Sequence, residues 1–198
     1  MNGNGVKPRV SAPTRLLAIC GSLRKASYNR SALLALAELA APDYDIEVRL
    51  LHDIPMYDHD YVDEHGNPEA VEQFRAAIAA ADGIIVCTPE YSHSISGVLK
   101  NALDWLHGKP PVLGAKPVAI MSVSSSGLGG SRAQYDLRKI LQPSEAYVLG
   151  MPEMMIGGAR RKFDEHGVLT DEATRTELAA FLAAFGAWIR LVRQPAVV

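Results

Sequence analysis

The chain has 198 residues, with 20 lysines and arginines against 22 aspartates and glutamates, which gives a formal net charge of −2 at pH 7. A chain of this length usually folds as one domain with a buried core, and its near-neutral charge predicts no nucleic-acid partner, because nucleic-acid binders present a basic face. Its two cysteines are too few for a disulfide framework. No apolar run approaches the roughly 20 residues that cross a bilayer, so we expect no membrane partner.

The N-terminal segment, residues 1–14, is polar and rich in glycine, proline and asparagine. It lacks the apolar stretch of a secretion signal, and we expect a flexible tail on a cytoplasmic protein whose cysteines stay reduced. We expect a single domain over residues 15–194.

Apolar runs of strand length then alternate with longer stretches of helical period. The expected strands are residues 15–21, 45–51, 83–88, 116–123 and 145–150. The expected helices are residues 27–41, 68–81, 96–107, 129–141 and 170–192. Because the strands are continuously apolar and alternate with helices, we predict an α/β fold, a doubly wound five-stranded parallel sheet with helices on both faces. The flavodoxin-like strand order is 2-1-3-4-5, and in it ligands bind where the order reverses, between strands 1 and 3.

The loop after the first strand, "CGSLRKASYN" at residues 20–29, is dense in hydrogen-bond donors. Gly21 permits a tight turn, and Ser27 or Asn29 can sit at the start of the next helix. The first amides of that helix, together with the hydroxyls and the Arg24 guanidinium, could hold a phosphate. A capped turn with solvent-facing cations explains the same residues, and spacing alone does not decide between the two.

The loop after the third strand reads "TPEYSHSISGVLKNALDW" over residues 88–105. Pro89 stiffens it and Tyr91 can lie flat against a planar ring. We expect the backbone amides of residues 90–93 to meet that ring, and we place Asn101 and Asp104 on the solvent side of the helix or at its cap.

The loop after the fourth strand, "SSSGLGGSRAQYDLRKIL" at residues 124–141, has glycines at 127, 129 and 130 that permit close backbone approach. We expect Ser131 to cap the helix that follows. The run is not a G-x-G-x-x-G motif, because residue 132 is arginine, and its significance is that it is a third loop on the same edge of the sheet.

Together these segments resemble the NAD(P)H-dependent FMN reductase family of flavodoxin-like proteins, which includes bacterial chromate and quinone reductases. The resemblance covers residues 15–175, and the pairing of "GSLRKASYN" with "PEYSHSISGVLKNALDW" carries it. It implies a bound FMN, NADPH or NADH as co-substrate, and small-molecule electron acceptors such as flavins and quinones, with chromate and azo compounds as further candidates.

The resemblance also implies which residues hold the cofactor. The phosphate would be held by Ser22, Arg24, Ser27 and Asn29. The isoalloxazine would be lined by Pro89, Glu90, Tyr91 and Ser92, and the ribityl chain or ring edge approached by Ser124 and Gly127. Two positions depart from the family pattern, since Ser92 replaces its usual asparagine and Ser96 its usual proline.

No catalytic protein residue is expected, because the flavin carries the chemistry in this family. An electron carrier of the flavodoxin type, which binds FMN without using a nicotinamide, is the alternative. A nucleotide-binding regulatory module without redox activity is a third. The carrier predicts a strongly acidic docking face, whereas this chain is nearly neutral.

Other features have ordinary explanations. The histidines and acids of residues 52–65 have irregular spacing, so we expect a solvated loop and no metal site. His93 could protonate a quinone but is expected to be a polar loop residue. A homodimer or homotetramer is implied by the family, with residues 96–107 and 134–155 as candidate contacts. Met151, Met154 and Met155 could contribute to that contact or fill the core.

Overall fold

The structure is a computed structural model that describes residues 12–108 and 111–193. Its described part contains one parallel sheet made of six strands. These are β1 (Thr14–Cys20), β2 (Tyr44–Arg49), β3 (Gly83–Thr88), β4 (Pro117–Val123), β5 (Tyr147–Val148) and β6 (Met154–Ile156). The order β2-β1-β3-β4-β5, with β6 also paired to β4, confirms the predicted flavodoxin-like topology.

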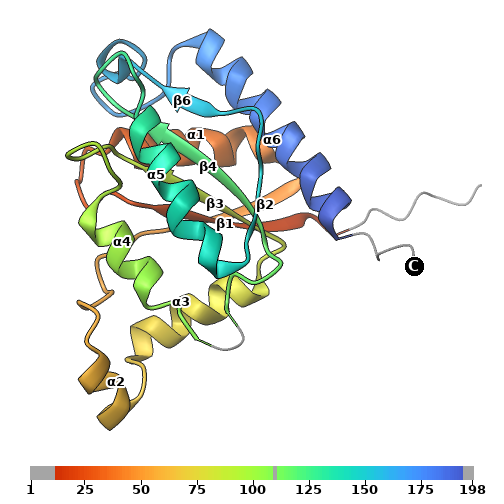
Figure 1. The fold of residues 1–198 in the computed structure, drawn as a ribbon. Coiled ribbons are helices and arrows are strands. Elements are labelled where there is room, and N and C mark those ends of the chain that lie inside the picture. Colours follow the sequence, from red (N-terminus) through yellow and green to blue (C-terminus); the bar gives the residue numbers. More distant parts are fainter. Residues whose placement is uncertain (1–11, 109–110, 194–198) are drawn as a thin grey trace, which may run out of the picture.

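Helices cover both faces of this sheet (Figure 1). They are α1 (Tyr28–Ala40), α2 (His59–His65), α3 (Glu69–Ala80), α4 (Gly97–Asp104), α5 (Ser131–Leu141) and α6 (Glu172–Val192). One hydrophobic cluster joins α1 and α6 to the sheet, and a second joins α3, α4 and α5 to its other face. Because both faces are covered, the central strands β3 and β4 are buried along their whole length.

The edges of the sheet differ from the prediction. β2 alternates between half-buried and exposed residues, as an edge strand does, and its sequence YDIEVR alternates in the same way, so the expectation of a continuous apolar run was wrong for this strand. The expected fifth strand at residues 145–150 is only two residues long, and the chain then leaves the sheet and returns as β6 beside Met121–Val123. Met154 is consequently part of the core, whereas Met151 is 71% exposed.

The long C-terminal helix α6 packs as predicted. Its side chains at spacings of three and four residues, Leu178, Phe181, Leu182, Phe185 and Ile189, are all buried. Asp171 is the N-cap, because its carboxylate accepts the backbone N–H of Thr174 at 2.9 Å. The Trp188 indole donates to the Tyr147 carbonyl at 2.8 Å and so joins this helix to the edge of the sheet.

One helix start, one additional helix and one helix face differ from expectation. α5 begins after Gly129 and Gly130, which both have positive φ, so Gly130 occupies the N-cap position predicted for Ser131. α2 was not predicted, and it extends away from the rest of the fold with none of its residues buried (Figure 1). Asn101 is buried instead of solvent-facing, because its amide accepts the Tyr57 N–H at 2.8 Å and donates to the Pro55 carbonyl at 2.7 Å.

The ends of the expected domain are only partly described. Residues 1–11 of the predicted tail, and residue 194 of the predicted domain, lie outside the described residues. β1 begins at Thr14, one residue before the predicted start of the domain. Within the described part of the chain, no helix is long and apolar enough to cross a membrane.

Candidate functional site

The loop that follows β1 turns sharply against β3. The Gly21 N–H donates to the Cys87 carbonyl at 2.8 Å, and a Cβ at Gly21 would lie 3.1 Å from the Leu99 Cδ2 atom. Only a glycine fits this approach without displacing its neighbours. The chain then enters α1 through Ser27, whose hydroxyl accepts the Arg30 N–H at 3.3 Å and caps the helix as predicted.

This loop has the donors that an anion requires. The Ser22 hydroxyl accepts the Arg24 N–H at 3.5 Å, and the Ser27 hydroxyl accepts that of Arg30, so each oxygen can still donate its own proton. Both serines are buried, whereas the Arg24 side chain is exposed. The first-turn amides of α1 add the positive end of the helix dipole. A phosphate at this position would meet hydroxyl, amide and guanidinium donors together.

Asn29 connects two of the loops. Its Nδ2 donates to the Val123 carbonyl at 3.2 Å, and its Oδ1 accepts the Val123 N–H at 3.1 Å. The Cys87 thiol donates to the same Oδ1 at 3.2 Å. The side chain is 5% exposed, so these bonds form in the interior. Asn29 therefore fixes the start of α1 to the end of β4, and its side chain uses its acceptor oxygen and one of its two N–H donors on protein.

The loop after β3 contains a tight turn. Tyr91 and Ser94 exchange backbone hydrogen bonds of 3.0 Å, and the two residues between them, Ser92 and His93, have φ of 49° and 67°. Positive φ at both central positions is typical of a type I′ turn, where glycine and asparagine are favoured. Two residues of other types at these positions indicate strain of the kind that collects at functional sites.

Helix α5 braces this strained turn. The Ser94 hydroxyl donates to the Asp136 carboxylate, and Lys139 lies 2.6 Å from that same carboxylate. The Lys139 and Ser94 hydrogen bonds hold the pKa of Asp136 below its usual range. One residue before Tyr91, the largely covered Glu90 carboxylate accepts from the Arg132 Nε at 2.6 Å. The turn is therefore held from one side by the start of α5.

Ser96, where the resemblance implied a proline, joins the loop after β1 to the loop after β3. Its buried hydroxyl donates to the Gly21 carbonyl at 2.5 Å and accepts the Leu99 N–H at 3.3 Å, which caps α4. A proline at this position could not make either side-chain bond. The Ser96 side chain thus makes a direct contact between the loop after β1 and the loop after β3.

The loop after β4 rests on β6. The Ser124 N–H donates to the Ile156 carbonyl at 2.9 Å, and the Gly158 N–H donates to the Ser126 carbonyl at 2.9 Å. A Cβ at Gly157 would lie 2.6 Å from the Gly127 carbonyl oxygen, so the two backbones touch. The strand that the sequence pattern missed therefore supports one of the three loops.

These loops enclose a common hollow at the carboxyl edge of the sheet. Of the ten residues predicted to hold a cofactor, eight line a hollow of about 190 Å³, namely Ser22, Arg24, Ser27, Asn29, Pro89, Glu90, Tyr91 and Ser124. The remaining two, Ser92 and Gly127, are exposed on the turn and the glycine loop and do not line it. Tyr28, Val123 and Ser125 line it without having been predicted.

A second hollow of about 350 Å³ shares Ser22, Arg24 and Tyr91 with the first and extends toward Ser96 and Gly97. Ligand pockets usually measure about 300–1,000 Å³, and the two hollows together fall in that range. Tyr91 is half exposed between them. Its ring is available to a planar ligand that spans both hollows.

The other polar features have no comparable setting. Among the residues that the structure describes, no group of three or more His, Cys, Asp and Glu side chains could hold a metal ion. The segment predicted as a solvated loop, residues 52–65, is mostly exposed, but its residues 59–65 form α2 and Ile54 is buried. Its His52 ring lies 3.1 Å from the Leu23 carbonyl. Cys20 and Cys87 are register partners on β1 and β3, and burial raises the pKa of both thiols, that of Cys87 strongly. Neither thiol is activated.

The fold and the hollow define a class of protein, the flavodoxin-like proteins that bind a phosphorylated planar cofactor at the strand-order reversal. The sequence profile of the NADPH-dependent FMN reductase family matches residues 14–161 of this chain. That match covers more than half of the chain, and the chain belongs to this family. The resemblance stated from its loops is thereby confirmed.

Individual relatives agree with this membership. The chain is 41% identical to an NAD(P)H-dependent FMN reductase of Pseudomonas aeruginosa over 186 residues, 93% of this chain and the whole of that relative. It is 38% identical over 187 residues to a quinone reductase of Escherichia coli, again over 93% of this chain and all of the relative. Among solved structures, the flavoenzyme NAD(P)H:(acceptor) oxidoreductase FerB from Paracoccus denitrificans has 32% identity and a TM-score of 0.80, covering 90% of this chain and 98% of FerB.

Proposed function

We propose that the chain is an NAD(P)H-dependent reductase that binds FMN in the hollow between the three loops and passes electrons to flavins, quinones or similar small acceptors. Family membership and relatives of about 40% identity over their full length support the activity. The observation that carries the location is the convergence of eight predicted residues from three separate loops on one hollow. NADPH and NADH are both candidate co-substrates.

The residues present fit FMN. The buried hydroxyls of Ser22 and Ser27, the Arg24 guanidinium and the first amides of α1 form a donor set suited to a phosphate. Pro89, Glu90, Tyr91 and Ser124 would line the ring and the ribityl chain, with the Ser92 and Gly127 loops beside them. Asn29 would contribute by positioning α1 against β4, since its amide is bonded to Val123.

When bound, FMN supplies the redox chemistry, accepting a hydride from the nicotinamide and returning electrons to an acceptor. The protein's residues orient the bound flavin and polarise its ring. The turn at 91–94, braced by Asp136 and Arg132, presents its backbone at a fixed position beside the ring site. Donors fixed in advance stabilise negative charge without reorganisation. Tyr91 is half exposed between the two hollows, so its ring can pack against the flavin ring at an open edge of the site.

The phosphate assignment is tested by Arg24→Ala. FMN affinity should fall by about 1.5–3 kcal/mol, which is roughly one to two decades in Kd, because a hydrogen bond to a charged partner is lost. Riboflavin lacks the phosphate, so its affinity should hardly change. Arg190→Ala, at an exposed arginine in the last turn of α6, is the control and should alter neither ligand. Equal losses for FMN and riboflavin would overturn the assignment.

The reductase itself is separated from an electron carrier by coenzyme oxidation. The flavin-loaded protein should oxidise NADH or NADPH in the presence of a quinone, with repeated turnover. Binding of FMN without oxidation of either coenzyme would favour the electron carrier over the reductase. A protein that cannot be loaded with FMN at all would favour the regulatory module.

We also propose a homodimer or homotetramer in the cytoplasm, formed by one flavodoxin-like domain over residues 15–194. Large exposed apolar side chains around α5 and its neighbouring loops support an interface between copies; they are Tyr91, Leu128, Tyr135 and Met151. A monomeric mass at micromolar concentration in solution would contradict this part of the proposal.

A further inference from the structure

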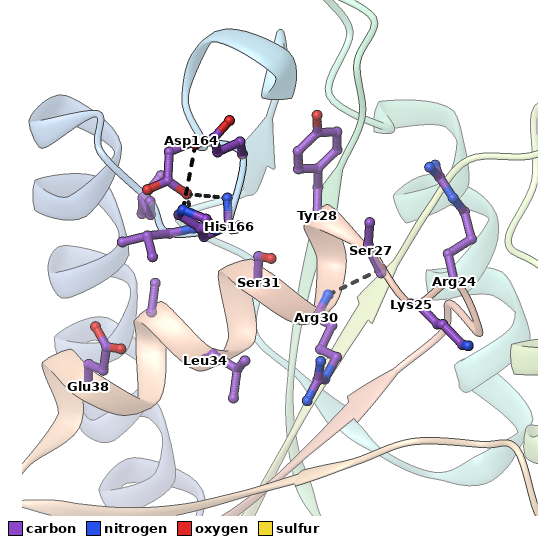
Figure 2. A pocket seen from close by; sticks show the side chains of 16 residues that line it. Arg24, Lys25, Ser27, Tyr28, Arg30, Ser31, Leu34, Glu38, Asp164 and His166 are labelled. Carbon is purple, nitrogen blue, oxygen red and sulfur yellow. Dashed lines mark hydrogen bonds and ion pairs between the residues drawn. The ribbon is translucent and has the colours of Figure 1, made fainter.

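A larger groove lies beside the cofactor hollow, with a volume of about 510 Å³. One wall is α1 and the loop before it, and the other is the turn at residues 164–169 (Figure 2). The groove shares Arg24, Ser27 and Tyr28 with the hollow, so it continues from the end at which the cofactor phosphate is placed. Nothing in the proposed binding of FMN uses the rest of its lining.

The groove has a cationic end. Arg24, Lys25 and Arg30 are all exposed there, at the loop before α1 and on its first turn (Figure 2). In the part of the chain that the structure describes, the ion pairs involve other basic residues, and none of these three takes part. One phosphate monoester carries only about −1.5 to −2 charges at pH 7. Three cations and a helix dipole can therefore accommodate more anionic charge than the FMN phosphate brings.

The middle of the groove is apolar. Leu34 is 41% exposed on α1, and Val168 is 53% exposed on the turn, both within the lining. Ala35 and Leu169 lie beneath them. Farther along α1, beyond Leu34, lies Glu38, whose carboxylate can accept hydrogen bonds (Figure 2). The groove thus offers cations first, then an apolar floor, then an acceptor.

The opposite wall is firmly built. The Asp164 carboxylate accepts the His166 N–H at 2.9 Å and the Val168 N–H at 2.8 Å, and Phe163 pairs with Leu169 across the base of the turn. Gly167 has φ of +81°, and a Cβ there would lie 2.7 Å from the Ser31 Oγ atom. The turn consequently sits directly on α1, and the groove between them is preformed.

We infer that this groove binds the adenosine diphosphate half of the nicotinamide coenzyme, an inference that rests on the proposed function. The nicotinamide has to meet the flavin ring, which the proposal places at Pro89–Tyr91. A ribose and a phosphate follow the nicotinamide, much as a ribityl chain and a phosphate follow the flavin ring. A coenzyme lying alongside FMN therefore brings its diphosphate to Arg24, Lys25 and Arg30.

The adenosine then extends into the groove. Its base can cover the apolar surface of Leu34 and Val168, and its ribose hydroxyls can donate to Glu38, as acidic residues do for nucleotide riboses elsewhere. The order of the lining residues along α1 matches the order of these chemical groups. Arg30 lines the groove and not the cofactor hollow, so the two sites can be tested separately.

ADP-ribose, which lacks the nicotinamide, is a direct probe. Calorimetry on the flavin-loaded full-length protein should show binding that Arg30→Ala weakens about tenfold, the loss expected for one hydrogen bond to a charged group. The KM for NADH and NADPH should rise about tenfold with kcat unchanged. N-benzyl-1,4-dihydronicotinamide, which lacks the adenosine diphosphate half, should reduce the flavin equally well in both proteins.

Arg190→Ala is the matched control and should leave ADP-ribose affinity and every rate unchanged. Leu34→Trp is a second variant at an exposed position, and it should block ADP-ribose by filling the groove while leaving FMN affinity intact. Arg30→Ala and Leu34→Trp could both leave the ADP-ribose affinity and the coenzyme KM unchanged while N-benzyl-1,4-dihydronicotinamide still reduces the flavin. That result would overturn the assignment of the groove to the coenzyme and leave the proposed function standing. Failure of the short donor and of both coenzymes to reduce the flavin would instead overturn the proposed function.

Discussion

Asn29 offers the sharpest test of how the three loops are held together. Its side chain makes two hydrogen bonds to Val123, of 3.1 and 3.2 Å, and accepts a third from the Cys87 thiol. Asn29→Ala would leave the buried N–H and carbonyl of Val123 without partners. Each buried group left in this way costs about 1–3 kcal/mol, so the free energy of unfolding should fall by roughly 2–6 kcal/mol.

The effect on ligands separates positioning from direct contact. If Asn29 acts by holding α1 against β4, Asn29→Ala should weaken FMN and riboflavin by similar factors, because both depend on the loops that this bond aligns. If its amide instead contacts the phosphate, FMN alone should lose affinity. Urea unfolding of the apoprotein and fluorescence titration with both flavins measure the two quantities.

Asn101→Ala is a matched control. Asn101 is as buried as Asn29, with 6% exposure against 5%, and it too makes two hydrogen bonds across a loop, to Tyr57 and Pro55. Its loss should reduce stability to a similar degree and leave flavin affinity nearly unchanged. An Asn29→Ala protein of wild-type stability that binds riboflavin normally and FMN poorly would refute the positioning role.

Three further predictions concern the surroundings of the site. Because burial raises the pKa of both cysteine thiols, the native protein should react with no equivalents of a thiol reagent at pH 8, and the unfolded protein with two. Reaction of the native protein would show that β1 and β3 open at Cys20 and Cys87. Ser96→Ala should weaken flavin binding and reduce the free energy of unfolding by about 0.5–2 kcal/mol through loss of the α4 cap. Ser131→Ala, at a position that is not a cap, should change the free energy of unfolding little, and equal effects of the two substitutions would contradict the cap assignment. The pKa of Asp136 is lower in the folded state than in the unfolded chain, so its carboxylate stabilises the protein above about pH 4 and loses this contribution as the pH falls through the lowered value. The difference in unfolding free energy between wild type and Asp136→Asn, measured in urea melts, should therefore shrink over that range. A difference that persists at lower pH would contradict this reasoning.

The sequence predicted the centre of the sheet better than its edge. β1, β3 and β4 are buried on both faces, so their apolar runs are continuous and easily recognised. β5 and β6 are two and three residues long, and a run that short cannot be distinguished from a loop by its pattern. The short helix α2 buries no residue, so it has no apolar face to detect.

The site shows the same division. Loop composition was enough to indicate which residues meet at the hollow, since parallel strands place their carboxyl ends on one edge. The partner of Asn29 is 94 residues away, and no local pattern indicates that its amide is used by β4. The paired positive φ values at Ser92 and His93 were equally hidden, because these residue types are uncommon in such turns.

The central claim, that this chain is a flavin-dependent NAD(P)H reductase, is tested most directly by anaerobic visible spectroscopy. Purified protein loaded with FMN should hold one flavin per chain, lose its absorbance near 450 nm when NADH or NADPH is added, and regain it when a quinone follows. A loaded flavin that neither coenzyme bleaches, under conditions in which dithionite does, would contradict the claim.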